Sequence, residues 1–79
     1  MALERGRLLA FMRDQLGVDT DDIDDSTPLF SSGRIDSFSL VSLVIFLEDA
    51  TGSRIALGDV TLENLDTVGR MLAFAGRLP

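Results

Sequence analysis

Apolar residues recur every three or four positions in three stretches of the chain, a spacing typical of helices that bury one face. In the first stretch, residues 3–16, the apolar positions at this spacing are Leu8, Leu9, Phe11, Met12 and Leu16. Charged residues stand between them, and Gly17 follows, a residue type that commonly ends helices. The pattern predicts an amphipathic helix over residues 3–16.

The second stretch begins at Asp36 and Ser37 and runs to about residue 52. Polar residues of this kind cap the free N–H groups at a helix start. On a helical wheel, the stripe expected to face the core consists of Leu40, Leu43, Val44 and Leu47. Phe38, Val41 and Ile45 lie on a different flank, which is more apolar surface than a one-sided helix needs. Two interpretations stay open: a docking surface, or packing under the long loop or the third helix.

The rest of the chain completes a helical bundle. Residues 18–36 are rich in Asp, Ser, Thr and Gly and predict a long loop, with apolar anchors at Ile23, Leu29, Phe30 and Ile35. Residues 55–60 predict an irregular segment and residues 61–65 one helical turn. Asp66 is expected to cap a last helix with inward positions Val68, Met71, Leu72 and Phe74 or Ala75. We therefore expect an all-α fold, a small bundle of three main helices plus one short helix, with the long loop between helices one and two.

Length and composition exclude several kinds of chemistry. The 79 residues are 46% apolar, enough for one modest core and for a single domain over residues 1–79. Histidine and cysteine are both absent, so nucleophilic Cys/His or Ser/His/Asp sites cannot form, and zinc sites lose their usual ligands. Neither disulfides nor a deep active-site cleft is expected.

The net charge of −6 indicates which partners to expect. Nucleic acid and anionic membranes would be repelled, whereas basic protein surfaces would be attracted. No segment has the roughly 20 consecutive apolar residues that span a bilayer, and the N-terminus does not show the pattern of an export signal. We expect a soluble, cytoplasmic chain with protein partners, and no nucleic acid or membrane.

Acidic residues gather in the long loop and invite a calcium interpretation. The acids are Asp19, Asp21, Asp22, Asp24 and Asp25. Counted from Asp19, the sixth position of a calcium loop is Asp24 instead of glycine, and the twelfth is Phe30 instead of glutamate. A solvated acidic loop without a metal fits better. Acid–base catalysis by paired carboxylates, such as Glu48 with Asp49, is also disfavoured, because it needs a desolvated carboxyl and a substrate held nearby, and adjacent acids at the polar end of a surface helix provide neither.

The start of the second helix is the place where a phosphate could be attached. Ser37 would stand at a helix N-terminus, whose free N–H groups and partial positive charge favour an anion. Gly33 would allow a sharp turn before it, and Asp36 could help to hold Mg²⁺ during a phosphoryl-type transfer. From these residues alone, a serine that simply caps the helix is the stronger interpretation.

This region resembles the attachment motif of acyl, peptidyl and aminoacyl carrier proteins. The matching run is Leu29-Phe30-x-x-Gly33-x-Ile35-Asp36-Ser37-Phe38, followed by Leu40-Val41-x-Leu43-Val44-x-x-Leu47-Glu48. The expected order of helices matches over essentially the whole chain. The resemblance implies that Ser37 receives 4′-phosphopantetheine from coenzyme A, through a phosphopantetheinyl transferase that recognises Asp36, Ser37 and the start of helix two. The carrier itself would be no enzyme.

Two further features bear on the kind of carrier. Carriers of fatty-acid synthesis commonly have acids where this chain has Ser39 and Ser42. The negative charge along helix two is thereby reduced to Glu48 and Asp49. The other residues of the expected docking surface are Asp36, Phe38, Val41 and Ile45. Residues 62–68 are similar to freestanding carriers that a separate adenylating enzyme loads.

The resemblance therefore implies a discrete carrier, and a shuttling role favours a monomer. It would shuttle a thioester-bound acyl or aminoacyl group from an adenylating enzyme to an acyltransferase or synthase, in polyketide or nonribosomal-type biosynthesis of natural products such as antibiotics. The alternative is an unmodified acidic helical adaptor that binds a basic protein. It explains the charge and the apolar flank equally well, but not why Gly33, Asp36 and Ser37 stand together.

Overall fold

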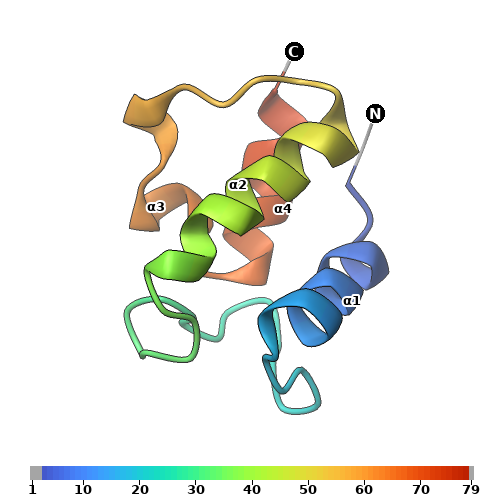
Figure 1. The fold of residues 1–79 in the computed structure, drawn as a ribbon, viewed down its shortest axis with the longest axis vertical. Coiled ribbons are helices and arrows are strands. Elements are labelled where there is room, and N and C mark those ends of the chain that lie inside the picture. Colours follow the sequence, from blue (N-terminus) through green and yellow to red (C-terminus); the bar gives the residue numbers. More distant parts are fainter. Residues whose placement is uncertain (1–2, 79) are drawn as a thin grey trace.

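Four α-helices and one 3₁₀ turn make up the computed structural model, which describes residues 3–78 (Figure 1). In chain order they are α1 (Arg5–Leu16), α2 (Phe38–Thr51), the 3₁₀ turn η1 (Leu57–Asp59), α3 (Leu62–Leu65) and α4 (Val68–Arg77). Residues 3–78 contain no strand, so the predicted all-α bundle of three main helices and one short helix is confirmed. Within the same residues, every helix is too short or too polar to cross a membrane.

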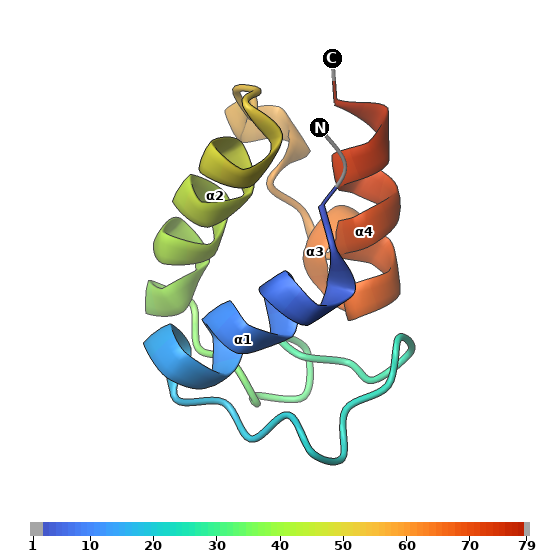
Figure 2. The ribbon, with the colours of Figure 1, turned by 90° about the vertical axis from the view of Figure 1, so that its right-hand side faces the viewer.

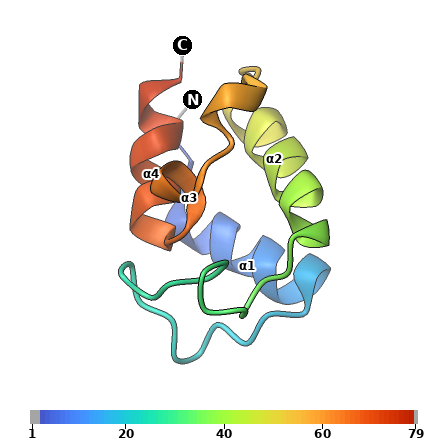
Figure 3. The same ribbon diagram turned by 90° about the vertical axis from the view of Figure 1, so that its left-hand side faces the viewer.

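The helices enclose one core. α2 and α4 form two upright sides, and α1 crosses their lower ends (Figure 2). On the opposite side, the short α3 lies beside α4, and the long loop closes the bottom of the bundle (Figure 3). The fully buried side chains between these elements are Leu8, Met12, Leu29, Leu43, Leu47, Leu65, Val68 and Met71. Leu40 and Val44 are half-buried against this core, so the predicted inward stripe of α2 is confirmed.

The first helix begins two residues later than expected, at Arg5, and ends as expected at Gly17. α2 ends in the same manner at Gly52. Both glycines adopt the left-handed conformation that commonly terminates helices. The apolar periodicity therefore located both helices, with an error of two residues at the start of α1.

The long loop is pinned to the bundle by apolar and ionic contacts. Leu29 and Ile35 are buried, and Ile23 and Phe30 are half-buried, as the sequence predicted. At the loop surface, the Arg5 guanidinium donates hydrogen bonds of 2.9 and 2.5 Å to the Asp25 carboxylate. The segment is thus an ordered part of the fold that leads from α1 to the start of α2.

The prediction that Asp66 caps the last helix is wrong. The cap of α4 is Thr67, which has extended backbone and accepts a hydrogen bond from the Arg70 N–H. Asp66 keeps helical backbone at the end of α3, and its buried carboxylate turns to the long loop. Oδ1 accepts from the N–H groups of Leu29, Phe30 and Ser31 at 3.3, 2.8 and 2.9 Å, and Oδ2 accepts from the Ser31 hydroxyl at 2.6 Å.

Gly69 lies where the loop touches the first turn of α4. Its N–H donates to the Asp25 carbonyl at 3.0 Å, and a Cβ at this position would stand 2.9 Å from the same oxygen. We expect Gly69→Ala to lower the free energy of unfolding by about 1 to 2 kcal/mol, because the loop must shift. Urea denaturation measures this. Gly76→Ala in the same helix has open space around the new methyl group and should leave stability unchanged or raise it.

Candidate functional site

The start of α2 leaves the Ser37 side chain free. Asp36 performs the capping: its Oδ1 accepts from the Ser39 N–H at 3.0 Å. Ser37 already has helical backbone, with φ −66° and ψ −24°, and within residues 3–78 its hydroxyl makes no capping hydrogen bond. The residue is exposed at the N-terminus of a fourteen-residue helix. The interpretation of Ser37 as a simple helix cap is therefore wrong, and its hydroxyl is available for chemistry.

A hydrogen-bonded turn leads the chain to this position. The Ile35 N–H donates to the Leu29 carbonyl at 3.0 Å, and the Gly33 N–H donates to the Phe30 carbonyl at 3.2 Å. Gly33 has φ +82°, a conformation that side chains disfavour, so the predicted sharp turn at this glycine is confirmed. Burial of Ile35 then anchors the chain one residue before Asp36. The turn fixes the direction from which Ser37 enters α2.

A mainly apolar cleft of about 170 Å³ opens beside Ser37. The long loop, α2 and the segment around α3 all contribute to its lining, which consists of Phe30, Ser37, Leu40, Val60, Thr61, Leu62 and Leu65. A second groove, of about 240 Å³, shares Leu40 and Val60 with the cleft and continues along α2 past Val41, Val44, Ile45 and Leu57. Ser37 thus lines an apolar cleft that adjoins a second apolar groove along α2.

The apolar flank of α2 is exposed. Phe38 is 92% exposed, Val41 65% and Ile45 52%, so the alternative in which these residues are buried under the loop is wrong. Two residues that the sequence interpretation missed extend the same apolar region: Leu57 in η1, 88% exposed, and Leu62 in α3, 53% exposed. We call these five residues the apolar face. Leu57 looked like an ordinary loop position, because only the folded chain brings η1 beside α2.

The acidic residues predicted for docking differ in their availability. Glu48 is half-buried, and its Oε2 accepts from the Ile55 N–H at 2.8 Å, so this carboxylate holds the segment after α2 in place. Asp49 is exposed and lies on the rim of a groove between α1 and α2. Asp36 is exposed and retains one carboxylate oxygen beyond its capping bond. Asp36 and Asp49 are the better placed of the three to meet a partner.

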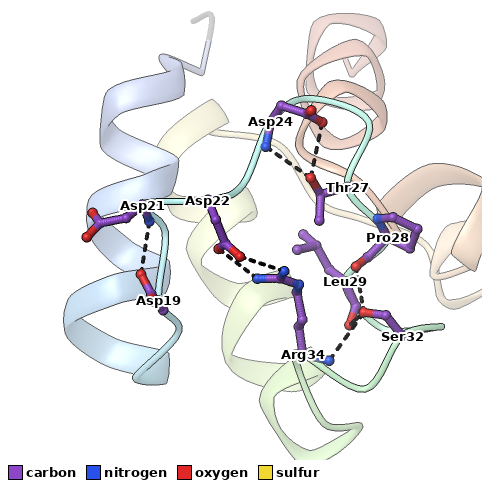
Figure 4. Close-up of polar contacts among 9 residues, drawn as sticks. All are labelled: Asp19, Asp21, Asp22, Asp24, Thr27, Pro28, Leu29, Ser32 and Arg34. Carbon is purple, nitrogen blue, oxygen red and sulfur yellow. Dashed lines mark hydrogen bonds and ion pairs between the residues drawn. The ribbon is translucent and has the colours of Figure 1, made fainter.

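Three acids of the long loop, Asp19, Asp22 and Asp24, accept hydrogen bonds from within the loop (Figure 4). The Arg34 guanidinium donates two 2.9 Å hydrogen bonds to Asp22 and holds the pKa of that carboxyl below its ordinary value. The Ser26 N–H and the Thr27 hydroxyl lower the pKa of Asp24 in the same way. Among residues 3–78, no three acidic side chains are grouped so that they could hold a metal ion.

The geometry described above combines an accessible serine at a helix start with an apolar depression beside it. The sequence model of one protein family, the phosphopantetheine attachment site, matches residues 6–75. This chain belongs to the phosphopantetheine-bearing carrier family. The predicted cofactor, covalently attached 4′-phosphopantetheine, is thereby confirmed for the carrier, and carriers of this family are in general modified and loaded by other enzymes.

A solved structure supports the fold of the carrier. One chain of a structure titled "Crystal structure of FAD-dependent dehydrogenase" is 30% identical to it, with a TM-score of 0.71. The similarity covers 84% of the carrier and 93% of the other chain, so the two chains are close in length. No curated protein sequence matches the carrier.

Proposed function

We propose that Ser37 carries the phosphopantetheine of this carrier. The observation that supports this is the division of roles at the start of α2, where Asp36 caps the helix and the Ser37 hydroxyl stays exposed and unbonded. The fit is favourable, because the phosphodiester would form at the positive end of α2. In the transfer, the Ser37 oxygen bonds to the phosphorus that bears pantetheine, adenosine 3′,5′-bisphosphate leaves from coenzyme A, and the hydroxyl proton passes to a base of the transferase. Mg²⁺ on the transferase, which the free oxygen of Asp36 could help to hold, would offset the phosphate charge.

The role of the loaded protein is transport. When bound, the prosthetic group supplies a terminal thiol that holds an acyl or aminoacyl group as a thioester. The chain has no cysteine that could take this group over and no histidine, and it acts as a substrate of other enzymes instead of a catalyst. We propose a discrete, monomeric, cytoplasmic carrier, loaded by an adenylating enzyme and emptied by an acyltransferase or synthase of polyketide or nonribosomal-type biosynthesis.

Intact-mass spectrometry tests the attachment. The protein is incubated with coenzyme A, Mg²⁺ and a promiscuous phosphopantetheinyl transferase, and the expected result is a gain of one phosphopantetheine. A wild-type protein that stays unmodified, while a known carrier is converted in the same tube, contradicts the proposal. That outcome would favour the unmodified acidic adaptor.

The apolar face supplies a docking surface for these enzymes. Ser37 is next to Phe38 of this face in the chain, and the exposed acids Asp36, Asp59 and Glu63 lie within two residues of its members. An apolar centre with a charged rim is the usual composition of a protein interface. We propose that partner enzymes contact the apolar face and present basic residues to the rim.

Replacement of Val41 by aspartate should disrupt docking more than the loss of a rim charge. We expect Val41→Asp to lower kcat/KM of the loading enzyme by about tenfold or more, because docking would bury an unpaired charge. Asp49→Asn should have a smaller effect, which fades at high salt. Glu48→Gln is a poorer comparison, since Glu48 also binds Ile55. Ala73→Asp at an exposed position of α4 serves as control, and a larger effect of Asp49→Asn than of Val41→Asp would reverse the ranking.

One further partner class has support from the comparisons. The similar chain of nearly equal length comes from a structure titled for an FAD-dependent dehydrogenase. We therefore include a flavin-dependent dehydrogenase that oxidises the carried acyl group among the candidate partners. Anaerobic mixing of the loaded carrier with such an enzyme should bleach the flavin, whereas the free acid should not.

A further inference from the structure

The buried Asp66 connects two walls of the Ser37 cleft. One wall is Phe30, whose N–H donates to Asp66 Oδ1 at 2.8 Å. The other includes Leu62 and Leu65 of α3, and the Leu62 carbonyl accepts from the Asp66 N–H at 2.9 Å. One residue thus bonds, through its side chain and its main chain, to both sides of the cleft. Its carbonyl adds a third tie, since it accepts from the Leu29 N–H at 2.8 Å.

The turn that Asp66 holds leads on to Ser37. Asp66 holds the first residues of the turn that starts at Leu29 and returns at Ile35, where the Ile35 N–H meets the Leu29 carbonyl. Ser37 follows two residues later and lines the cleft opposite α3. Because the turn is closed by its own hydrogen bonds, a shift at its beginning is transmitted to its end. Asp66 therefore fixes the spacing between Ser37 and α3.

We propose, on the basis of Ser37 as the attachment site, that Asp66 is a positioning residue: it sets the relative placement of Phe30, Ser37 and α3 that the phosphopantetheinyl transferase recognises. Asp66 itself is buried, so its side chain is not presented to coenzyme A or the transferase. It acts through the loop that it holds, so its loss weakens recognition of the carrier while a bound Ser37 hydroxyl remains reactive.

The charge of Asp66 persists at neutral pH. Burial raises the pKa of this carboxyl, but the hydrogen bonds from Ser31, Phe30 and Leu29 outweigh that effect and bring the pKa below its ordinary value of 3.8. No other titratable side chain forms a hydrogen bond with the Asp66 carboxylate in the described residues. The Asp66 carboxylate therefore keeps its charge and its hydrogen bonds at neutral pH, and it does not act as a pH switch.

Steady-state kinetics of phosphopantetheine transfer test this role, with variants assayed at a temperature where circular dichroism shows each to be folded. For Asp66→Asn we expect kcat/KM to fall about tenfold, mainly through a higher KM for the carrier. Gly69→Ala loosens the other anchor of the loop, at Asp25, away from the cleft, and should leave kcat/KM unchanged. An unchanged KM in folded Asp66→Asn, or an equal loss in Gly69→Ala, would show that Asp66 only stabilises the fold.

A second variant and an independent spectroscopic measurement complete the test of Asp66. If Asp66→Asn does not fold, Ser31→Ala removes only the Oδ2 hydrogen bond, and an unchanged KM in this variant overturns the proposal. Amide spectra of the unmodified protein form an independent arm: the Ser37 and Leu62 signals should shift in Ser31→Ala and Asp66→Asn but stay in place in Gly69→Ala. These spectra do not depend on modification. A wild type that takes up no phosphopantetheine would refute the attachment site, while displaced Ser37 signals would still show that Asp66 positions the cleft.

Discussion

Ser37→Ala abolishes the mass gain with coenzyme A and transferase, and it leaves no thioester after incubation with any loading enzyme. This is the expected result, because in our proposal the hydroxyl oxygen of Ser37 is the atom that bonds to phosphorus. The substitution should cost little stability, since Asp36 and not Ser37 caps α2. Intact mass before and after the reaction measures the loss, and a melting curve shows that the variant remains folded.

Ser39→Ala is the matched control for this loss. Ser39 lies two residues further along the same helix and offers the transferase the same functional group. Its N–H contacts Asp36 through the main chain, which alanine preserves. We expect full modification of Ser39→Ala. A gain that persists in Ser37→Ala would place the arm on another hydroxyl.

Local sequence patterns were sufficient to predict the helices. α1 and α2 each have an uninterrupted apolar periodicity, and each is followed by a glycine, Gly17 or Gly52. The end of each helix could therefore be predicted from residues within one turn of it. The short α3 was also predicted from a local pattern, within residues 61–65. The 3₁₀ turn η1 was not predicted, because three residues around Gly58 carry no periodicity.

The candidate site could be predicted only in part. Ser37 and the flank of Phe38, Val41 and Ile45 lie on one helix, so a wheel brings them together. Leu57 and the cleft walls come from distant segments, and no local pattern shows that they meet. The wrong prediction of the helix cap at Asp66 also results from contacts between distant segments. Asp and Thr are both good caps, and the choice between Asp66 and Thr67 depended on donors about 35 residues away in the loop.

Asp66→Ala should destabilise the fold strongly at neutral pH. The substitution removes the acceptor of four hydrogen bonds and leaves the N–H groups of Phe30 and Ser31 without this partner in a partly buried region. We expect a loss of about 2 to 4 kcal/mol, a large share of the roughly 4 to 12 kcal/mol typical of a domain of this length. Urea denaturation at pH 7 measures the loss. Glu63→Ala, which removes the same charge from an exposed position of α3, should change stability by under about 0.5 kcal/mol.

The pH dependence of this difference identifies the carboxylate as its source. Because folding lowers the pKa of Asp66, the unfolded chain binds its proton first, so the stabilisation is complete above the ordinary value of 3.8 and is lost as the pH falls through the folded pKa. The gap in unfolding free energy between wild type and Asp66→Ala should therefore be constant from about pH 7 to 5 and shrink below about pH 4. Contributions from Asp22 and Asp24 are present in both proteins and cancel. A gap that stays constant down to about pH 3 would mean that the packing of the side chain, and not its charge, holds the loop.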